Sequence, residues 1–393
     1  MMNQEEQWLL PDGVEEVLPE RARAIEQLRR RALDLYASWG YELVFPPLIE
    51  FLESLLNGAG RDLERETFKI TDQLSGRLMG VRADITPQVA RIDAHSLHRK
   101  GPARLCYCST ALRARPAQAG GSRLPYQLGV ELFGPAGGDS DLEVILLMLE
   151  TLALPGIDQP LVLDLGHVGI FRALVDACGL DQGDQARLED IYLRKARAEL
   201  DAFLGEHELP ASAARALAAL PFLDGDAGVF ADAHALLQDC PPALTALAEL
   251  EWLVAALQGS GARVHLDLGE LRGYHYHTGC VFAAYRAGDS EPLAKGGRYD
   301  HIGEVFGRAR PATGFSADLK KLASLAPVSL GGGILARGDL SDPAFAAEVA
   351  RLRADGERVV LALSGADNDP VELGCDRQLL AADGGWALQS ISS

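Results

Sequence analysis

An amide and a carboxylate lie on the same side of a short segment with strand character, between Arg123 and Phe133. Side chains alternate along a strand, so Gln127, Gly129 and Glu131 share one face while leucine and valine residues occupy the other. The missing side chain at Gly129 leaves room between the two polar groups, which favours a binding surface for a small polar molecule. A solvated face of an antiparallel sheet is the alternative, and alternation alone does not separate the two.

A second group of polar residues follows in the segment from residue 263 to 285, whose composition also predicts a strand. If this strand is continuous, one of its faces carries Arg272, Tyr274, Tyr276, Thr278 and Cys280. An arginine on a buried strand needs an anionic partner, which a ligand carboxylate or Glu131 could supply. A structural ion pair is the alternative role for Arg272.

The loop and strand from residue 112 to 131 resemble motif 2 of the class II aminoacyl-tRNA synthetases, in the form found in histidyl-tRNA synthetases. The matching positions are Arg113, Gln118, Gly120, Arg123, Gln127, Gly129 and Glu131. Arg115 stands where that family has glutamate, Gly121 stands where it has arginine, and Pro116 with Ala117 replaces an Arg-Pro pair. The resemblance implies that this loop, which holds ATP and the tRNA end in the synthetases, has been rewritten.

The segment around residue 85 resembles the part of the synthetases that holds the amino acid. Asp84 and Thr86 match an acid and a threonine that hold the ammonium group of the substrate, with aspartate in place of the family's longer glutamate. Thr86 also precedes Pro87, and this pair predicts a helix N-cap, which is a sufficient structural role for the threonine.

The segment from residue 263 to 285 resembles the histidine-specific segment of histidyl-tRNA synthetases, whose pattern begins Leu-Val-Arg-Gly-Leu-Asp-Tyr-Tyr. It keeps Arg272, Gly273 and Tyr276, while His275 and His277 replace the aspartate and the second tyrosine. Together the resemblances imply a histidine-binding set formed by Asp84, Thr86, Arg113, Gln127, Glu131, Arg272 and Tyr276.

The segment from residue 295 to 322 resembles motif 3. The matching positions are Gly296, Gly297, Arg298, Tyr299, Asp300, Gly307, Pro311, Gly314 and Phe315. The family's Gly-Leu-Glu-Arg ending is replaced by the run from Asp318 to Lys321. The lost arginine packs against ATP in that family, and lysine lacks the planar fork that stacks and binds bidentately. The ATP half of the site is therefore expected to be degraded.

Composition limits the classes of function. The 393 residues include 37 lysine and arginine against 56 acidic residues, for a formal net charge of -19. Nucleic-acid binding takes most of its affinity from basic side chains on phosphates, so we do not expect this chain to bind tRNA.

No apolar run approaches the roughly 18 residues that span a bilayer, and the acidic N-terminal segment does not resemble a secretory leader. We expect a cytoplasmic protein without membrane contact.

Cysteine and histidine spacing gives no metal signature. The six cysteines have no zinc-ribbon spacing, and Cys106 and Cys108 are expected to be small buried thiols on one face of a strand. His275 and His277 form a close pair, but no nearby carboxylate or cysteine completes a ligand set. We expect no metal, no other cofactor and no disulfide.

The resemblance to the class II synthetases implies an α+β fold with an antiparallel sheet flanked by helices over residues 1–322. Strands are expected at residues 41–45, 63–70 and 77–82. Alanine- and leucine-rich helices from about residue 167 to 258 indicate a helical insertion. Residues 323–393 predict a small α/β unit that resembles a truncated anticodon-binding domain.

Residues 40–50 resemble motif 1, which implies a homodimer. The whole pattern resembles the regulatory subunits of ATP phosphoribosyltransferase, a family of histidyl-tRNA synthetase paralogues. That resemblance implies a non-catalytic chain that binds L-histidine, joins the short-form catalytic subunit in a hetero-oligomer (a hetero-octamer is what the family suggests) and mediates feedback inhibition of the first step of histidine biosynthesis. Two alternatives stay open: a functional class II amino-acid-activating enzyme, and a histidine-binding protein for another partner.

Overall fold

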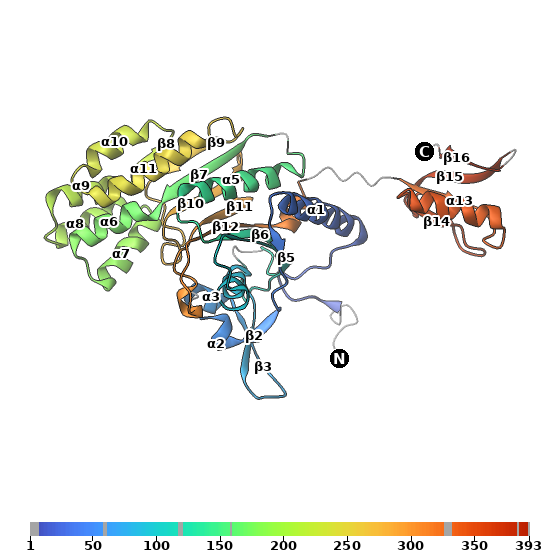
Figure 1. The fold of residues 1–393 in the computed structure, drawn as a ribbon, viewed down its shortest axis with the longest axis horizontal. Helices are drawn as coiled ribbons and strands as arrows, with labels where there is room; N and C mark the ends of the chain where they lie inside the picture. Colours follow the sequence, from blue (N-terminus) through green and yellow to red (C-terminus); the bar gives the residue numbers. More distant parts are fainter. Residues whose placement is uncertain are drawn as a thin grey trace. The chain divides into compact units, whose positions relative to one another are not determined.

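The computed structural model describes residues 8–57, 61–116, 121–157, 159–325, 332–382 and 385–391. The chain divides into two compact units, Met1–Pro327 and Val328–Ser393, which are described separately (Figure 1). No helix in the described ranges is both long and apolar enough to cross a membrane.

Within the described residues, the first unit is built on a nine-stranded, mostly antiparallel sheet. In spatial order its strands are β1 (Glu42–Leu43), β5 (Ala103–Thr110), β6 (Tyr126–Phe133), β12 (Ala312–Asp318), β11 (Ala294–Arg298), β10 (Cys280–Arg286), β7 (Leu161–His167), β9 (Arg263–Asp267) and β8 (Asp224–Gly225). Neighbouring strands are antiparallel except for β1 with β5 and β7 with β9, which run parallel. The sheet therefore joins segments that lie far apart in the sequence.

Helices α1 (Pro19–Ser38) and α5 (Gly138–Ala153) pack on one face of this sheet (Figure 1), and α12 (Leu319–Ala323) contributes to the same core. Cys106, Val130 and Phe315 point into this core, and the Tyr36 ring of α1 meets the Phe315 ring edge-on with centroids 6.3 Å apart. Because these positions alternate with polar ones along the strands, the polar side chains lie on the opposite face of the sheet. That face carries the predicted site.

A smaller sheet stands beside the large one. It consists, in the described residues, of β2 (Ile49–Phe51), β4 (Leu78–Val81) and β3 (Phe68–Thr71), with the short helices α2 (Leu52–Leu55) and α3 (Arg61–Glu66). The prediction of one strand over residues 63–70 is wrong in its first half, because the straight-chain polar residues before Thr67 form α3. The next elements are α4 (Thr86–Arg91) and the π-helix η2 (Ile92–Leu97).

The region between β7 and β9 is helical, as the composition predicted. Its helices are α6 (Val168–Cys178), α7 (Gln182–Leu193), α8 (Arg197–Glu206), α9 (Ala211–Ala219), the short 3₁₀ helix η3 (Leu220–Phe222), α10 (Val229–Leu237) and α11 (Pro241–Ala256). They pack through fully buried residues such as Phe171, Leu188, Phe203 and Leu247, and Figure 1 shows them gathered at one end of the large sheet. We call residues 168–256 the helical insertion.

The second unit contains, in its described residues, a four-stranded sheet in the order β14 (Val359–Leu361), β13 (Gly333–Ala336), β15 (Cys375–Ala382) and β16 (Gly385–Ser390). Helix α13 (Pro343–Ala354) packs on it through Phe345, Val349 and Leu352. This unit is α/β, as predicted, whereas the β15–β16 hairpin was not identified from the sequence.

Candidate functional site

The space above Gly129 on the polar face is filled by the chain itself. A β-carbon at this position would lie 2.6 Å from the Tyr107 hydroxyl oxygen and would also meet the carbonyl oxygen of Phe315. The expectation that the missing side chain leaves room there for a ligand is therefore wrong. The glycine instead lets Tyr107, on the neighbouring strand β5, reach Glu131, to which its hydroxyl donates a hydrogen bond of 3.2 Å.

Glu131 is the central carboxylate of the site. Its side chain is 1% exposed and lies over Gly314 of the adjacent strand, where a β-carbon would collide with it. The hydroxyl groups of Tyr107 and Tyr299 both donate to it. Burial raises the pKa of Glu131 to about 8, although the hydrogen bond from Tyr299 acts in the opposite direction. The carboxyl group is therefore largely protonated at neutral pH, and a cation beside it would favour its ionised form.

Asp84, Thr86 and Gln127 form a connected network next to this carboxylate. The Gln127 Nε2 donates to Asp84 Oδ1 at 3.1 Å, and its Oε1 accepts from the backbone N–H of Ile85 at 3.2 Å. Asp84 Oδ1 also accepts from the backbone N–H of Thr86 at 2.9 Å. The Thr86 hydroxyl lies 3.2 Å from that of Tyr107, so the network continues through Tyr107.

The predicted N-cap role of Thr86 is wrong. Helix α4 begins at Thr86, and its side chain caps no backbone group of the helix. The carboxylate of Asp84 accepts from the Thr86 N–H instead. The threonine hydroxyl faces the site, where it contacts the Tyr107 hydroxyl.

Tyr276 also reaches the network. Its ring stacks on that of Tyr299 with centroids 5.0 Å apart and planes inclined by 25°. Burial raises the pKa of the Tyr276 hydroxyl well above its ordinary value, and the charges of Glu131 and Asp84 add to the increase. The hydroxyl oxygen is buried and has no hydrogen-bond partner among the described residues. Buried polar groups are normally paired, so this hydroxyl is suited to contact a ligand.

The predicted continuous strand through residues 263–285 is wrong. Residues 268–279 form turns between β9 and β10, and the side chain of Asp267 accepts from the backbone N–H of Gly269 at 3.0 Å. Gly273 has φ of 74°, a left-handed conformation that a strand does not contain. Arg272 and Tyr276 therefore do not share a strand face.

Arg272 makes an ion pair outside the network. Its side chain is 57% exposed, its guanidinium contacts the carboxylate of Glu270, and Asp164 lies 3.6 Å away. It also donates to the Tyr285 hydroxyl at 2.9 Å. The suggestion that Arg272 lies buried beside Glu131 is wrong. Arg272 instead forms the structural ion pair that was the alternative, with Glu270 as its partner. Glu270 stands where the synthetase pattern has leucine, and this substitution could have indicated the ion pair with Arg272.

Arg113 likewise forms no ion pair or side-chain hydrogen bond with the network among the described residues. Its Nε is 3.7 Å from Glu66. Asp318 begins α12 by accepting from the backbone N–H of Lys320 at 3.0 Å, and Lys321 donates to Glu291 at 3.1 Å. Gln118 and Gly120 of the motif 2 loop lie outside the described residues. The basic side chains Arg113, from the motif 2 segment, and Lys321, from the motif 3 segment, therefore each lie beside a carboxylate.

Sequence reasoning missed three side chains of the site: Tyr107, Tyr299 and His277. The His277 ring lies over Gly297, where a β-carbon would be 2.8 Å from it, and burial lowers the pKa of His277 to about 4. Tyr299 belongs to the matched motif 3 and could have been identified from it. Tyr107 could not, because its role depends on pairing with Gly129 across two strands.

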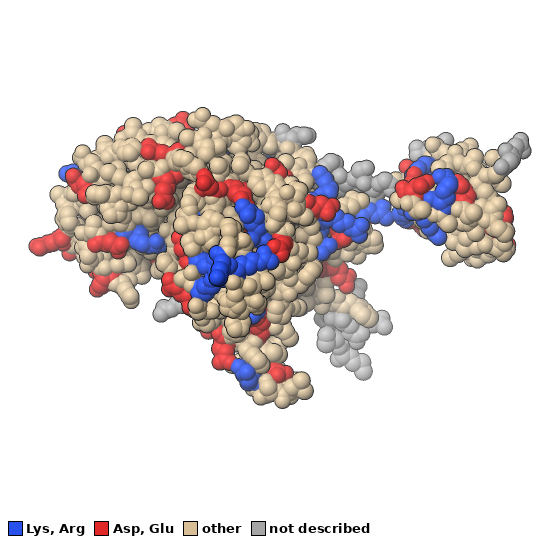
Figure 2. Space-filling model, viewed as in Figure 1, with Lys and Arg blue, Asp and Glu red and all other residues tan. Residues whose placement is uncertain are grey.

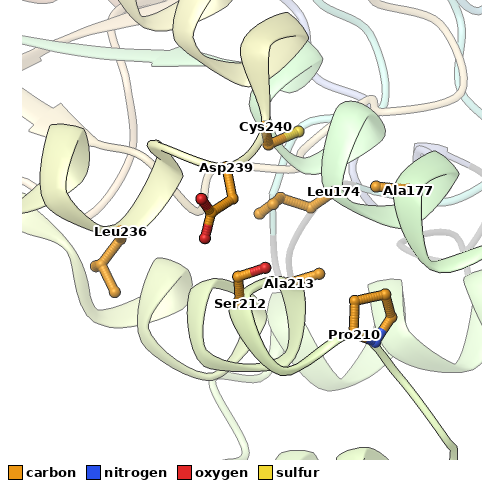
Figure 3. A pocket seen from close by; sticks show the side chains of 8 residues that line it. All are labelled: Leu174, Ala177, Pro210, Ser212, Ala213, Leu236, Asp239 and Cys240. Atoms are coloured by element: carbon orange, nitrogen blue, oxygen red, sulfur yellow. The ribbon is translucent and has the colours of Figure 1, made fainter.

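A separate cavity of about 220 Å³ lies in the helical insertion (Figure 3). It is lined by Leu174, Ala177, Pro210, Ser212, Ala213, Leu236, Asp239 and Cys240. None of the predicted histidine-binding residues lines it, and its wall is mostly apolar. It is distinct from the network on the sheet.

Comparison with known proteins identifies the family. Residues 13–322 match the family model of histidyl-tRNA synthetase, and residues 331–389 match that of the ATP phosphoribosyltransferase subunit HisZ C-terminal domain. The ATP phosphoribosyltransferase regulatory subunit of Thioalkalivibrio sulfidiphilus is 53% identical over 384 residues, covering 96% of this chain and 97% of that protein. The chain belongs to the ATP phosphoribosyltransferase regulatory subunit family.

Solved structures agree with the predicted fold class. An ATP phosphoribosyltransferase regulatory subunit/histidyl-tRNA synthetase from Bacillus halodurans superposes with a TM-score of 0.80 at 31% identity, covering 93% of this chain and 95% of that one. A histidyl-tRNA synthetase from Nostoc superposes with a TM-score of 0.76 at 18% identity, covering 98% and 97%. The α+β, class II synthetase-like fold predicted from the sequence is confirmed.

Proposed function

We propose that this chain is a non-catalytic regulatory subunit of ATP phosphoribosyltransferase that senses L-histidine. It acts with the short-form catalytic subunit in the first step of histidine biosynthesis, in the cytoplasm, and catalysis takes place in that partner. Family membership supports this role. The observation that carries it is the state of the site, in which the amino-acid half is assembled while basic groups of the ATP half are neutralised.

The amino-acid half is suited to an ammonium group. Asp84 and Glu131 are two carboxyl groups in one network, and Gln127 orients the first of them through a hydrogen bond of 3.1 Å. No basic side chain in the described residues forms an ion pair with Asp84 or Glu131, so a ligand ammonium would supply positive charge there. The Tyr276 hydroxyl, which has no hydrogen-bond partner among the described residues, would gain one. We assign Asp84, Thr86, Gln127, Glu131 and Tyr276 to the histidine site.

Arg272 and Arg113 are assigned to its margins. Arg272 can bind the ligand carboxylate only after leaving Glu270, because its Nε and Nη2 already donate to that side chain. Arg113 is likewise beside Glu66. Both stay in the proposed ligand set, and each must leave its present carboxylate partner before it can bind histidine.

The ATP half is not suited to amino-acid activation. That chemistry needs preorganised positive charge around the α-phosphate as it becomes five-coordinate. Arg113 and Arg272, at the margins of the histidine site, are the arginines that could supply part of this charge, but they lie beside Glu66 and Glu270. Lys321, at the position of the family's motif 3 arginine, donates to Glu291. On the face in Figure 2, basic side chains occur in several small groups among acidic and neutral ones, and no broad basic area suited to tRNA is visible there.

The motif 1 region supports a homodimer. β1 is an edge strand of the large sheet, and apolar side chains on and beside it are exposed. They are Leu43, Phe45, Leu48 and Ile49, of which Phe45 is 72% exposed. A second copy of the chain would cover this group, since apolar patches of this kind commonly mark protein interfaces. The hetero-oligomer with the catalytic subunit, in the form of a hetero-octamer, is part of the same proposal.

The test is the rate of phosphoribosyl-ATP formation by a short-form catalytic subunit, with and without this chain, across a histidine titration. We expect the chain to raise the rate and histidine to suppress the increase. Gln127→Ala should preserve the stimulation but require more histidine for inhibition, whereas Gln258→Ala, at an exposed glutamine after α11, should behave as wild type. An unchanged rate would refute the proposal, and histidine-dependent ATP–pyrophosphate exchange would then indicate amino-acid activation.

A further inference from the structure

One arginine of the helical insertion holds the loop that carries Tyr276. Arg172, on α6, donates to three backbone carbonyl oxygens of this loop: those of Tyr274 at 3.4 Å, His277 at 2.9 Å and Thr278 at 3.4 Å. Its guanidinium carbon also lies 5.1 Å from the centroid of the Tyr274 ring. The shape of the loop over residues 273–278 therefore depends on a side chain that belongs to another part of the fold.

The outer side of this loop packs on the insertion. The Tyr274 ring meets the Phe171 ring of α6 edge-on with centroids 5.2 Å apart, and Tyr274 is 8% exposed. His275 Nε2 lies 2.8 Å from a carboxylate oxygen of Glu189 on α7. Two successive residues of the loop thus contact two helices of the insertion.

The inner side of the same loop faces the proposed histidine site. Tyr276 stacks on Tyr299, and the His277 ring lies over Gly297 of the sheet. The backbone N–H groups of Tyr276 and His277 both donate to the carbonyl oxygen of Gly273, each at 2.8 Å. This tight turn makes the four residues 274–277 a unit, so a displacement of Tyr276 must also displace the groups that Arg172 holds.

We infer that Arg172 is a positioning residue that couples occupancy of the histidine site to the helical insertion. The inference rests on the proposed function, because it takes histidine as the ligand that contacts Tyr276. Histidine orders the inner side of the loop, and the three hydrogen bonds of Arg172 together with the Tyr274–Phe171 contact transmit that ordering to α6. The insertion, which contains none of the assigned ligand residues, becomes an element whose state depends on histidine.

The test is hydrogen exchange along the full chain with and without histidine, combined with calorimetric histidine affinity. In wild type we expect histidine to slow exchange in residues 273–279 and in α6. Arg172→Met should lose the protection of α6 and bind histidine roughly tenfold more weakly, which is within the usual range for coupled sites. Arg172→Lys should restore only part of both effects, because lysine keeps the charge but lacks the planar fork that reaches several carbonyl groups.

Arg187 provides a matched control on the same insertion. Like Arg172 it lies over an aromatic ring, that of Phe203 at 5.2 Å, but its polar partner is the carboxylate of Glu206 within the insertion. Arg187→Met should show the histidine affinity and the α6 protection of wild type. A loss of both in this variant would mean that any damage to the insertion has the same effect, and it would overturn the specific role of Arg172.

The possible failures are distinguishable. If wild type binds no histidine by calorimetry, the proposed function fails, whatever Arg172 does. If wild type binds histidine but exchange in α6 does not change, the coupling is refuted. Full protection and unchanged affinity in Arg172→Met refute the role of the arginine. Should that variant not fold, Arg172→Lys takes its place, and wild-type behaviour of that variant in both measurements overturns the inference.

Discussion

Replacing Glu131 with glutamine tests the electrostatics of the proposed histidine site directly. Burial raises the pKa of Glu131 to about 8, so roughly nine in ten molecules carry the proton at pH 7 and about half at pH 8. A histidine ammonium beside this group favours the carboxylate. Binding to wild type should therefore release about 0.9 proton at pH 7 and about 0.5 at pH 8, and affinity should rise with pH up to about 8.

The assay is isothermal calorimetry of histidine binding in two buffers that differ in ionisation enthalpy. The difference between the observed enthalpies gives the number of protons released. Glu131→Gln has no proton to lose at this position, so its release should be smaller than that of wild type by about 0.9 proton at pH 7. Any proton contributed by the ligand imidazole is common to both proteins and cancels. Equal release in the two proteins would refute the placement of the ammonium beside Glu131.

The same pKa gives a second readout in the absence of ligand. The pKa of Glu131 is raised from 4.5 in the unfolded chain to about 8 in the folded one, so the native state holds this proton more tightly. The stability contributed by the proton is fully present below about pH 4.5 and is lost as pH rises through 8, by about 5 kcal/mol in all. The free energy of unfolding, measured with urea, should fall less with rising pH in Glu131→Gln than in wild type. Parallel falls in the two proteins would contradict the inference that burial raises the pKa of Glu131.

Two further predictions concern neighbouring contacts. Glu270→Gln removes the charge that holds Arg272, so the guanidinium becomes available to the ligand carboxylate. Calorimetry should then show several-fold stronger histidine binding. An unchanged affinity would remove Arg272 from the ligand set. Gly129→Ala places a methyl group 2.6 Å from the Tyr107 hydroxyl oxygen and should lower the free energy of unfolding by about 1–3 kcal/mol while weakening histidine binding. Gly101→Ala, where a β-carbon meets nothing within 4 Å, is its control, and equal stability of the two variants would contradict the close packing at Gly129.

Local patterns predicted much of the fold. Ile25, Leu28 and Ala32 are spaced by three and four, the spacing of an amphipathic helix, and all three are buried on α1. Cys106 and Cys108 are buried together on β5, as their alternation indicated. These features depend on periodicity within one element, which the sequence displays directly.

The errors share a different origin. The segment through Arg272 has the composition of a strand, but the backbone turns at Gly269 and Gly273 break it. Residues 61–66 lie next to a true strand and form a helix instead. In both places overall composition misled, because a glycine in a left-handed conformation breaks the first segment and the straight-chain polar residues of the second favour a helix.

The sequence by itself determined which residues of β6 lie on the polar face, because side-chain alternation is a local property of a strand. The resemblance to the synthetases also implied, without coordinates, that the ATP half of the site is altered, because Arg115, Gly121 and Lys321 depart from the family pattern. Only the tertiary structure decided the partners: Tyr107 over Gly129, Tyr299 beside Glu131, and the Arg172 contacts across the loop. Those contacts depend on strand register and on the packing of the insertion, where residues far apart in the chain meet.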